Sequence, residues 1–210
     1  MFEDRADAGQ QLAQALEQYR GEGVLVLAIP RGGVEIGYEV AKHLEADFSL
    51  LITRKLPYPH NPEAGFGAIA EDGSTYRFER ASGFLKEETI QQIMAEQREE
   101  IERRIEVLRK GRPRPDISGR TVILVDDGIA MGSTMRASIQ MCKHQDAGRI
   151  IVGVPVAGPS VAREIEKLVD ELVVLEKPPN FRAVAQVYRN WYDVPDREVL
   201  ALMQAWEKEK

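Results

Sequence analysis

Sulfur and imidazole ligands are scarce in this 210-residue sequence, which has one cysteine and three histidines. A single thiol excludes a disulfide within the chain and fits a reducing compartment. The histidines, His43, His60 and His144, are scattered, and with one cysteine they do not make a zinc site. Cys142 falls within a predicted helix, and we expect it to lie in the core.

Basic charge and long apolar runs are also lacking. The net charge is −6 and the isoelectric point is about 5.3, so the electrostatic footprint of a nucleic-acid-binding protein is missing. No apolar run approaches the roughly 18 residues of a membrane span. The acidic start, MFEDRADAGQQ, lacks the apolar segment of a signal peptide. We therefore expect a cytoplasmic protein with no nucleic-acid or membrane partner.

Apolar runs alternate with helical patterns along most of the chain. Continuous aliphatic runs predict strands at 24–29, 48–53, 122–125, 149–157 and 171–176. Helical periodicity predicts helices at 10–20, 34–44, 86–109, 133–144, 159–168 and from 195 onward. This alternation predicts one α/β domain over residues 1–210, with an open, mainly parallel sheet and helices on both faces.

Two segments interrupt the alternation. RKLPYPHNPEAGFG (54–67) is rich in proline and glycine and predicts an irregular loop. AIAEDGSTYRF (68–78) predicts a hairpin about the Asp72-Gly73 turn. The helix at 86–109 has one apolar face and is most simply a surface helix of the domain. That face could instead meet a partner subunit, which would make the protein a homodimer.

The stretch VILVDDGIAMGST (122–134) joins a predicted strand to two carboxylates and a glycine-containing loop. Adjacent carboxylates repel each other, so a cation or a hydroxyl-bearing ligand usually compensates Asp126 and Asp127. The loop suits phosphate, because glycines let backbone N–H groups approach, Ser133 and Thr134 add hydroxyls, and a helix N-terminus follows. This segment predicts a ligand that carries both hydroxyls and phosphate.

Other strand ends and other motifs bear on this interpretation. In open parallel sheets ligands bind where strands end, and PRGG (30–33) and TRK (53–55) also fall there. Each alone would be a tight turn or a solvated strand end. The motifs G-x-x-x-x-G-K-[ST], G-x-G-x-x-G and G-x-S-x-G are absent. The Asp-x-Asp of aspartate-nucleophile phosphatases is also missing after this strand.

With these residues in place, VILVDDGIAMGST resembles the phosphoribosyl pyrophosphate (PRPP) motif of the type I phosphoribosyltransferases. AIPRGG (28–33) resembles their pyrophosphate-binding loop, and TRKLPYPHNPEAGFGAI (53–69) is similar to the flexible loop that closes over their active site. The tail from LEKPPNFRAV onward resembles that of a bacterial branch of the family. The resemblance covers almost the whole chain. It implies the type I fold with a flexible loop at about 54–67, a C-terminal hood at about 176–210, Mg²⁺ as cofactor, and PRPP and an unidentified base as substrates.

The resemblance also implies roles for individual residues. Asp126 and Asp127 would bind the ribose hydroxyls and the metal, and Arg31 would hold the pyrophosphate, next to a cis peptide bond at Pro30–Arg31. Catalysis is expected from Asp126, Asp127, Arg31 and Lys55. The residues expected to bind PRPP are Arg31, Gly32, Gly33, Arg54, Lys55, Asp126, Asp127, Gly128, Ile129, Ala130, Met131, Gly132, Ser133 and Thr134.

Two positions depart from the family pattern. Met131 stands where the motif usually has threonine, which removes a hydroxyl donor to the phosphate. A lost hydrogen bond to a charged group costs about 1.5–3 kcal/mol, enough to weaken binding but not to abolish the site. Ala130 stands where the 6-oxopurine enzymes carry aspartate, so hypoxanthine and guanine are expected to be poor acceptors.

The aromatic residues of the tail are candidates for stacking on a base. Phe181, Trp191 and Tyr192 are the expected base-binding residues, and Tyr188 is a further candidate. Core packing is the commoner role of such side chains. The favoured function is transfer of a 5-phosphoribosyl group from Mg-PRPP to a nitrogenous base. The alternative is a non-catalytic PRPP-binding regulator, which the acidic isoelectric point and the lack of an appended helix-turn-helix disfavour.

Overall fold

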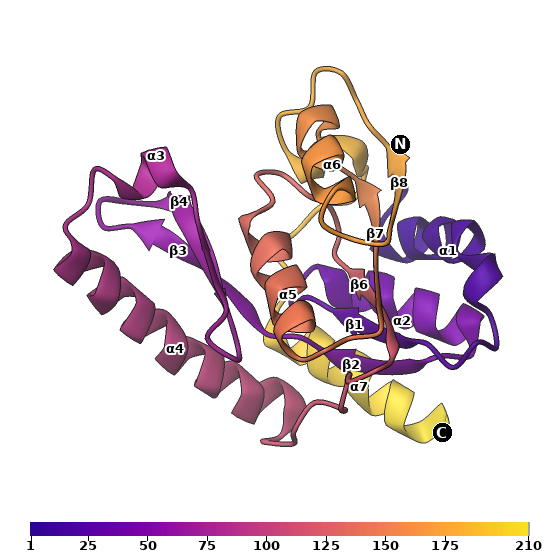
Figure 1. The fold of residues 1–210 in the computed structure, drawn as a ribbon. Coiled ribbons are helices and arrows are strands. Elements are labelled where there is room, and N and C mark those ends of the chain that lie inside the picture. The colour runs from indigo at the N-terminus through magenta and orange to yellow at the C-terminus, as the bar shows by residue number, and fades with distance from the viewer. Residues whose placement is uncertain (210) are drawn as a thin grey trace.

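The computed structural model describes residues 1–209. Its main body is a five-stranded parallel sheet of order β2-β1-β6-β7-β8 (Figure 1). The strands are β1 (Leu25–Ala28), β2 (Asp47–Leu50), β6 (Thr121–Val125), β7 (Arg149–Val156) and β8 (Glu171–Glu176). All four strand pairs are parallel. The predicted α/β architecture with an open parallel sheet is confirmed.

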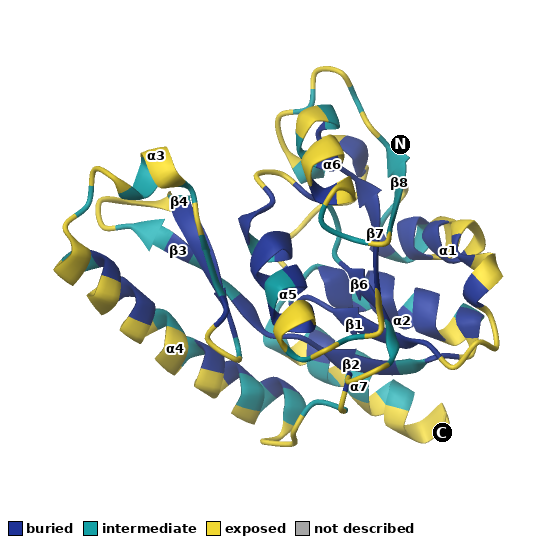
Figure 2. Cartoon of the chain, in the orientation of Figure 1, coloured by how far each residue is buried: buried dark blue, intermediate teal, exposed yellow. Residues whose placement is uncertain are grey.

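Helices cover both faces of this sheet. α1 (Arg5–Ala15) and α2 (Gly33–Leu44) lie on one face, and α5 (Ser133–His144) and α6 (Pro159–Glu166) lie on the other. Side chains of each strand alternate between two core clusters: Val26 joins the cluster of α1 and α2, whereas Leu25 and Leu27 join that of α5 and α6. The sheet interior is buried on both sides (Figure 2), as its continuous apolar runs predict.

A second layer forms an arm beside the main body. Its antiparallel sheet has the order β3-β4-β5, with β3 (Thr53–Tyr58), β4 (Asn61–Ala70) and β5 (Thr75–Arg77). The short helix α3 (Glu79–Ser82) and the long helix α4 (Glu87–Arg109) follow. The predicted turn at Asp72-Gly73 and the predicted long helix are confirmed. The apolar face of α4 packs against β3, β4 and α7 (Asp196–Glu209), as expected for a helix of this domain.

The prediction of an irregular segment at 54–67 is wrong, because most of this segment lies in the paired strands β3 and β4. The prolines are accommodated by position. Pro57 lies in β3, an edge strand, where the pairing register shifts on both sides of it. Pro62 lies in the part of β4 that extends beyond its pairing with β5. Proline is tolerated at edges and bulges because no ladder hydrogen bond needs its missing N–H.

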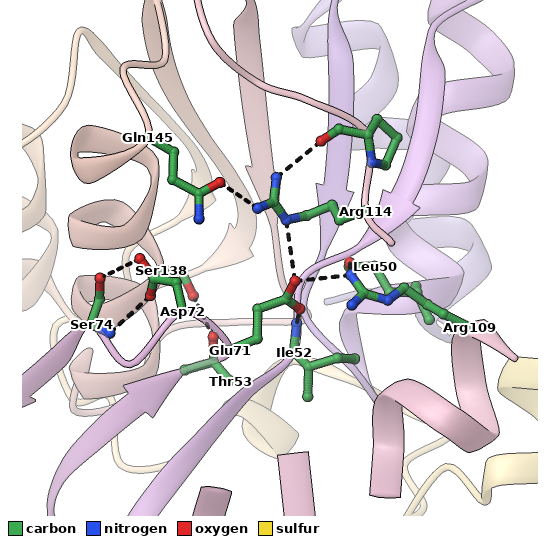
Figure 3. Close-up of polar contacts among 11 residues, drawn as sticks. Leu50, Ile52, Thr53, Glu71, Asp72, Ser74, Arg109, Arg114, Ser138 and Gln145 are labelled. Carbon is green, nitrogen blue, oxygen red and sulfur yellow. Dashed lines mark hydrogen bonds and ion pairs between the residues drawn. The ribbon is translucent and has the colours of Figure 1, made fainter. Parts of the chain in front are cut away.

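The base of the arm is fixed by a buried carboxylate, Glu71, at the end of β4. It accepts hydrogen bonds from the Ile52 backbone N–H at 2.8 Å, from Arg109 Nη1 at 3.0 Å and from Arg114 Nε at 3.3 Å (Figure 3). Both arginine side chains are more than nine-tenths buried. Glu71 therefore ties the arm's hairpin to the end of α4 and to the chain entering β6.

Two short 3₁₀ helices, Glu17–Tyr19 and Val184–Val187, complete the regular structure of residues 1–209. Cys142 lies in the core against the sheet, as expected. Within residues 1–209, no helix combines the length and the apolar character needed to cross a membrane.

Candidate functional site

Two strand ends meet at the carboxyl edge of the parallel sheet. β1 is followed by Pro30–Gly33 and β6 by Asp126 and Asp127, and these strands are direct neighbours. The loop after β1 lies against the two carboxylates: a Cβ atom on Gly32 would collide with the Asp127 carboxylate, and one on Gly33 would lie 2.9 Å from Asp126 Cα. The Pro30–Arg31 peptide bond is cis, as predicted. Only glycine allows this close approach of the two loops.

A cavity of about 290 Å³ opens beside Asp126. The whole loop from Gly128 to Thr134 lines it, together with Asp126, Lys55 and Glu63. Residues that are far apart in the sequence, and that come from the main body and the arm, are thus brought to one hollow. Its residues are Lys55, Glu63, Asp126, Gly128, Ile129, Ala130, Met131, Gly132, Ser133, Thr134, Met135 and Val184.

The N-terminus of α5 faces this cavity. Gly132 precedes the helix with φ of 81°, a left-handed conformation that favours glycine. Among residues 1–209, no side chain caps the helix by a hydrogen bond. The first backbone N–H groups of a helix have no acceptor within it, so those of Ser133, Thr134 and Met135 can serve a ligand. Together with the helix dipole, they suit an anion.

Arg5, at the start of α1, is paired with Asp127. The Arg5 Nε atom lies 3.0 Å from Asp127 Oδ2, and both side chains are largely buried, with 4 % and 14 % of their surface exposed. Arg5 Nη1 also donates to the backbone carbonyl of Tyr192 at 3.1 Å. The α1 helix begins at Arg5 because Asp4 caps it, accepting a hydrogen bond from Asp7 N–H.

The two aspartates have different surroundings. Burial and the charge of Asp127 raise the pKa of Asp126, whose Oδ1 accepts a hydrogen bond from the Asp127 backbone N–H at 2.8 Å. Burial raises the pKa of Asp127 as well, while the charge of Arg5 and its hydrogen bond lower it. Tyr188 donates its hydroxyl to the Asp127 carbonyl at 2.7 Å. Asp127 is thus fixed on several sides, whereas Asp126 lines the cavity.

The two basic residues of β3 point to different places. Lys55 lines the cavity and donates to the Glu63 carbonyl across the hairpin at 2.8 Å. Arg54 donates from Nε to Gln97 Oε1 of α4 at 3.1 Å. Burial lowers the pKa of Arg54, and the positive charge of Arg104 lowers it further. Neighbouring side chains of a strand alternate in direction, and this alternation separates the two cations.

Three aromatic residues of the tail, Tyr188, Trp191 and Tyr192, lie around Arg5, and Phe181 lies apart from them. The Arg5 guanidinium lies over the Trp191 ring, 4.1 Å from its centroid, and therefore covers one of its faces. The Tyr192 hydroxyl donates to Glu198 at 2.8 Å. Phe181 packs over Gly158, and Tyr188 is buried against Phe2 and Trp191. Base stacking by Phe181, Trp191 or Tyr192 stays a prediction.

Several residues around the site were not predicted from the sequence. The role of Arg5 could not be predicted, because a single arginine in the charged first helix has the same local pattern as a solvated surface residue. Val184, an aliphatic residue of the tail, lines the cavity and lies close to Gly128, where an added Cβ would be 2.7 Å from its Cγ1. Glu63 comes from the segment predicted as a loop, and its place depends on the hairpin pairing.

Comparison with known proteins identifies the family. A model of the phosphoribosyl transferase domain matches residues 3–190. A Mycobacterium tuberculosis protein named "Putative phosphoribosyl transferase" is 40% identical over 205 residues, which make up 97% of this chain and 46% of that protein. The chain thus spans about half the length of the curated relatives it matches.

Solved structures agree with this match. A crystal structure of a protein from Thermus thermophilus is 35% identical, with a TM-score of 0.81 and 98% of each chain covered. A structure from Aquifex aeolicus, 13% identical with a TM-score of 0.50 over 81% of this chain and 73% of that one, is similar in fold alone. The five-stranded parallel sheet with its small antiparallel sheet matches the type I fold. The chain belongs to the phosphoribosyl transferase domain family.

Proposed function

We propose that this chain transfers the 5-phosphoribosyl group of PRPP to a nitrogenous base and releases pyrophosphate. One observation supports the proposal: Asp126, the uncapped N-terminus of α5 and Lys55 line one cavity. This combination suits a ligand with a phosphate at one end and hydroxyls beside it. Residues 1–210 would act as one domain, with the tail from about 176 as its hood.

In this proposal the 5-phosphate lies in the loop from Gly128 to Thr134. The backbone N–H groups at the start of α5 and the hydroxyls of Ser133 and Thr134 donate to it. Lys55, which comes from the arm and lines the same cavity, supplies a positive charge. Ile129, Ala130 and Met131 add backbone and surface contacts, with one hydroxyl donor fewer than the family motif has.

Asp126 is the carboxylate that accepts hydrogen bonds from the ribose hydroxyls. Asp127, held by Arg5 and Tyr188, keeps Asp126 and the loop of Gly32 in place. As the bond from the anomeric carbon to pyrophosphate breaks, the ribose gains the character of an oxocarbenium ion. The negative charge of the aspartate pair stabilises this positive charge in the transition state.

Pyrophosphate would leave on the side of Arg31, taking the electron pair of the broken bond, while the nitrogen lone pair of the base forms the new bond to the anomeric carbon. The family's use of Mg-PRPP makes Mg²⁺ the expected cofactor. The hard carboxylate oxygens of Asp126 and Asp127 suit this ion, and Asp126 is the more available, because Arg5 occupies Oδ2 of Asp127. When bound, Mg²⁺ would supply charge neutralisation for the leaving pyrophosphate.

The acceptor is the least specified part of the proposal. Ala130 supplies no acid or base, so the proton lost by the base passes to water or to the leaving group. Hypoxanthine and guanine are therefore expected to be poor acceptors. A cytoplasmic location, the absence of nucleic-acid and membrane partners, and a homodimer remain expectations from the sequence.

The test is release of pyrophosphate from Mg-PRPP in the presence of single candidate acceptors, screened over purines, pyrimidines and small amides. We expect release that depends on one class of base and that falls at least about a hundredfold in Asp126→Asn, as for the loss of a charged transition-state contact. The matched control is Asp116→Asn, which removes an exposed carboxylate and should keep full activity. Binding of Mg-PRPP without release for any base would favour the regulator instead.

A further inference from the structure

Four arginines from three separate segments gather beside the loop of the cis peptide bond. Arg31 belongs to that loop, Arg54 to β3, and Arg103 and Arg104 to the middle of α4. They are close enough that the charges of Arg104, Arg31 and Arg103 each lower the pKa of Arg54, after burial itself. We call these four residues the arginine cluster.

Two carboxylates accompany the arginine cluster. Asp196, at the start of α7, lies between two of its members, with Oδ1 3.6 Å from Arg31 Nη1 and Oδ2 3.6 Å from Arg103 Nη1. Glu100 accepts from Arg103 Nε at 2.7 Å and from Arg104 Nε at 2.9 Å. Four positive charges therefore face two negative ones.

This excess of positive charge is partly buried. The Arg104 side chain is 10% exposed, and among residues 1–209 its only hydrogen bond is through Nε. Among the described residues, Arg54 donates only to the neutral Gln97. Burying like charges without compensation is costly, and arginine forks are suited to binding phosphate groups bidentately. An anion would supply the missing negative charge.

Asp196 marks the position that such an anion would take. Its carboxylate lies between Arg31 and Arg103 at ion-pair distance, and its Oδ1 is buried without a hydrogen-bond partner among the described residues. A carboxylate held in this way is a weaker ligand for the two arginines than a diphosphate, which offers more oxygens and more charge. Its place beside Arg31 puts the cluster next to Gly32 and Asp127.

We propose that Arg103 and Arg104 of α4, with Arg31 and Arg54, bind the diphosphate of the donor, and that Asp196 competes for this position when the diphosphate is absent. The identity of the donor rests on the proposed function, whereas the anion subsite rests on the cluster itself. Helix α4 thus takes part in substrate binding in addition to packing against β3 and β4 of the arm.

The experiment measures binding of inorganic pyrophosphate by calorimetry, with and without Mg²⁺, to the whole chain. We expect Arg103→Gln and Arg104→Gln each to weaken binding by about tenfold or more, as for the loss of a charge-assisted contact. Arg98→Gln is the control, since Arg98 is an exposed arginine on the same helix. Asp196→Asn should strengthen binding severalfold, because it removes the competing charge.

The outcomes separate this inference from the proposed function. Affinities for pyrophosphate in Arg103→Gln and Arg104→Gln equal to that of Arg98→Gln would overturn it, even if PRPP turnover is normal. Pyrophosphate binding that depends on both arginines, without any binding of PRPP, would support the subsite and contradict the transfer reaction. If Arg104→Gln does not fold, Arg104→Lys, which keeps the charge, and Arg103→Gln decide the matter.

Discussion

Arg5 Nε lies 3.0 Å from Asp127 Oδ2, and this pair joins the first helix of the chain to the strand end that carries the candidate site. Arg5 also contacts the tail, through the Tyr192 carbonyl and the Trp191 ring. One buried arginine thus connects three segments that are distant in the sequence. In the proposed function, this connection gives Asp127 a positioning role and leaves Asp126 to face the ligand.

Breaking this pair should affect both stability and PRPP binding. Removing one partner of a buried ion pair costs about 3–5 kcal/mol, because the other charge stays buried without compensation. We expect Arg5→Gln and Asp127→Asn each to lower the free energy of unfolding and to weaken Mg-PRPP binding. The double variant should be destabilised by less than the sum of the two, which urea titration measures. Strict additivity would contradict the coupling of the two residues.

Gly32 is a position at which any side chain should damage the site. A Cβ atom there collides with the Asp127 carboxylate, so Gly32→Ala should displace Asp127 or the loop that holds Arg31. We expect a folded protein whose affinity for Mg-PRPP falls by about tenfold or more, consistent with the loss of one contact to a charged group. Gly83→Ala is the control, because the nearest atom to its added Cβ lies at 3.4 Å. Equal affinities in the two variants would show that the loop adjusts freely.

Met131→Thr should improve PRPP binding. Met131 is 67% exposed and lines the cavity, so a threonine there could donate to the phosphate without disturbing the core. A hydrogen bond to a charged group contributes about 1.5–3 kcal/mol, or about ten- to 150-fold in affinity. Met131→Val, which has a branched side chain but no hydroxyl, is the control for calorimetry. Unchanged binding in both variants would mean that backbone N–H groups alone hold the phosphate.

Burial raises the pKa of Cys142 to about 12. In the unfolded chain a thiol titrates near pH 8.5, so between about pH 8.5 and 12 the folded state holds a proton that the unfolded state loses. This contribution to stability is complete below pH 8.5 and falls as pH rises, by up to about 1.4 kcal/mol per pH unit. Cys142→Ala should therefore show a shallower decline in unfolding free energy above pH 9. The native thiol should also resist an aromatic disulfide reagent at pH 8, and rapid labelling would contradict its burial.

The parallel sheet could be predicted from the sequence because buried strands are continuous aliphatic runs, and β1, β6 and β7 lie where these runs do. The segment from Asp126 to Thr134 could be singled out as a candidate site because its polar residues are contiguous in the sequence, and the structure places it at a cavity. Contacts between distant segments left no local pattern: the pairing of Arg5 with Asp127 and the arginine cluster exist only in the folded chain. The proline content of 54–67 favours an irregular loop, and that prediction is wrong. The edge position of β3 lets proline lie in a strand and overrides the local preference for a loop.

The hairpin of β3 and β4 is a candidate lid over the site. Lys55 and Glu63 line the cavity from opposite strands of it, and the Lys55 ammonium group donates to the Glu63 carbonyl. The pairing register shifts on both sides of Pro57, so the outer part of the hairpin is held less regularly than its base, where Glu71 anchors it. An oxocarbenium-like transition state is easily captured by water, and a lid that closes on bound substrate would exclude it.

We expect Mg-PRPP with an acceptor analogue to slow hydrogen exchange and proteolysis across residues 56–66. Closure would bring Lys55 onto the phosphate and order the strands beyond Pro57. Residues 71–74, which follow the opposite end of β4, are the internal control, because they lie away from the cavity and the buried contacts of Glu71 anchor this end of the hairpin. Slowed exchange at 56–66 with no change at 71–74 is the result expected of a lid. Equal exchange at 56–66 with and without saturating ligand would make the hairpin a rigid wall of the site, since nothing in it would then respond to substrate.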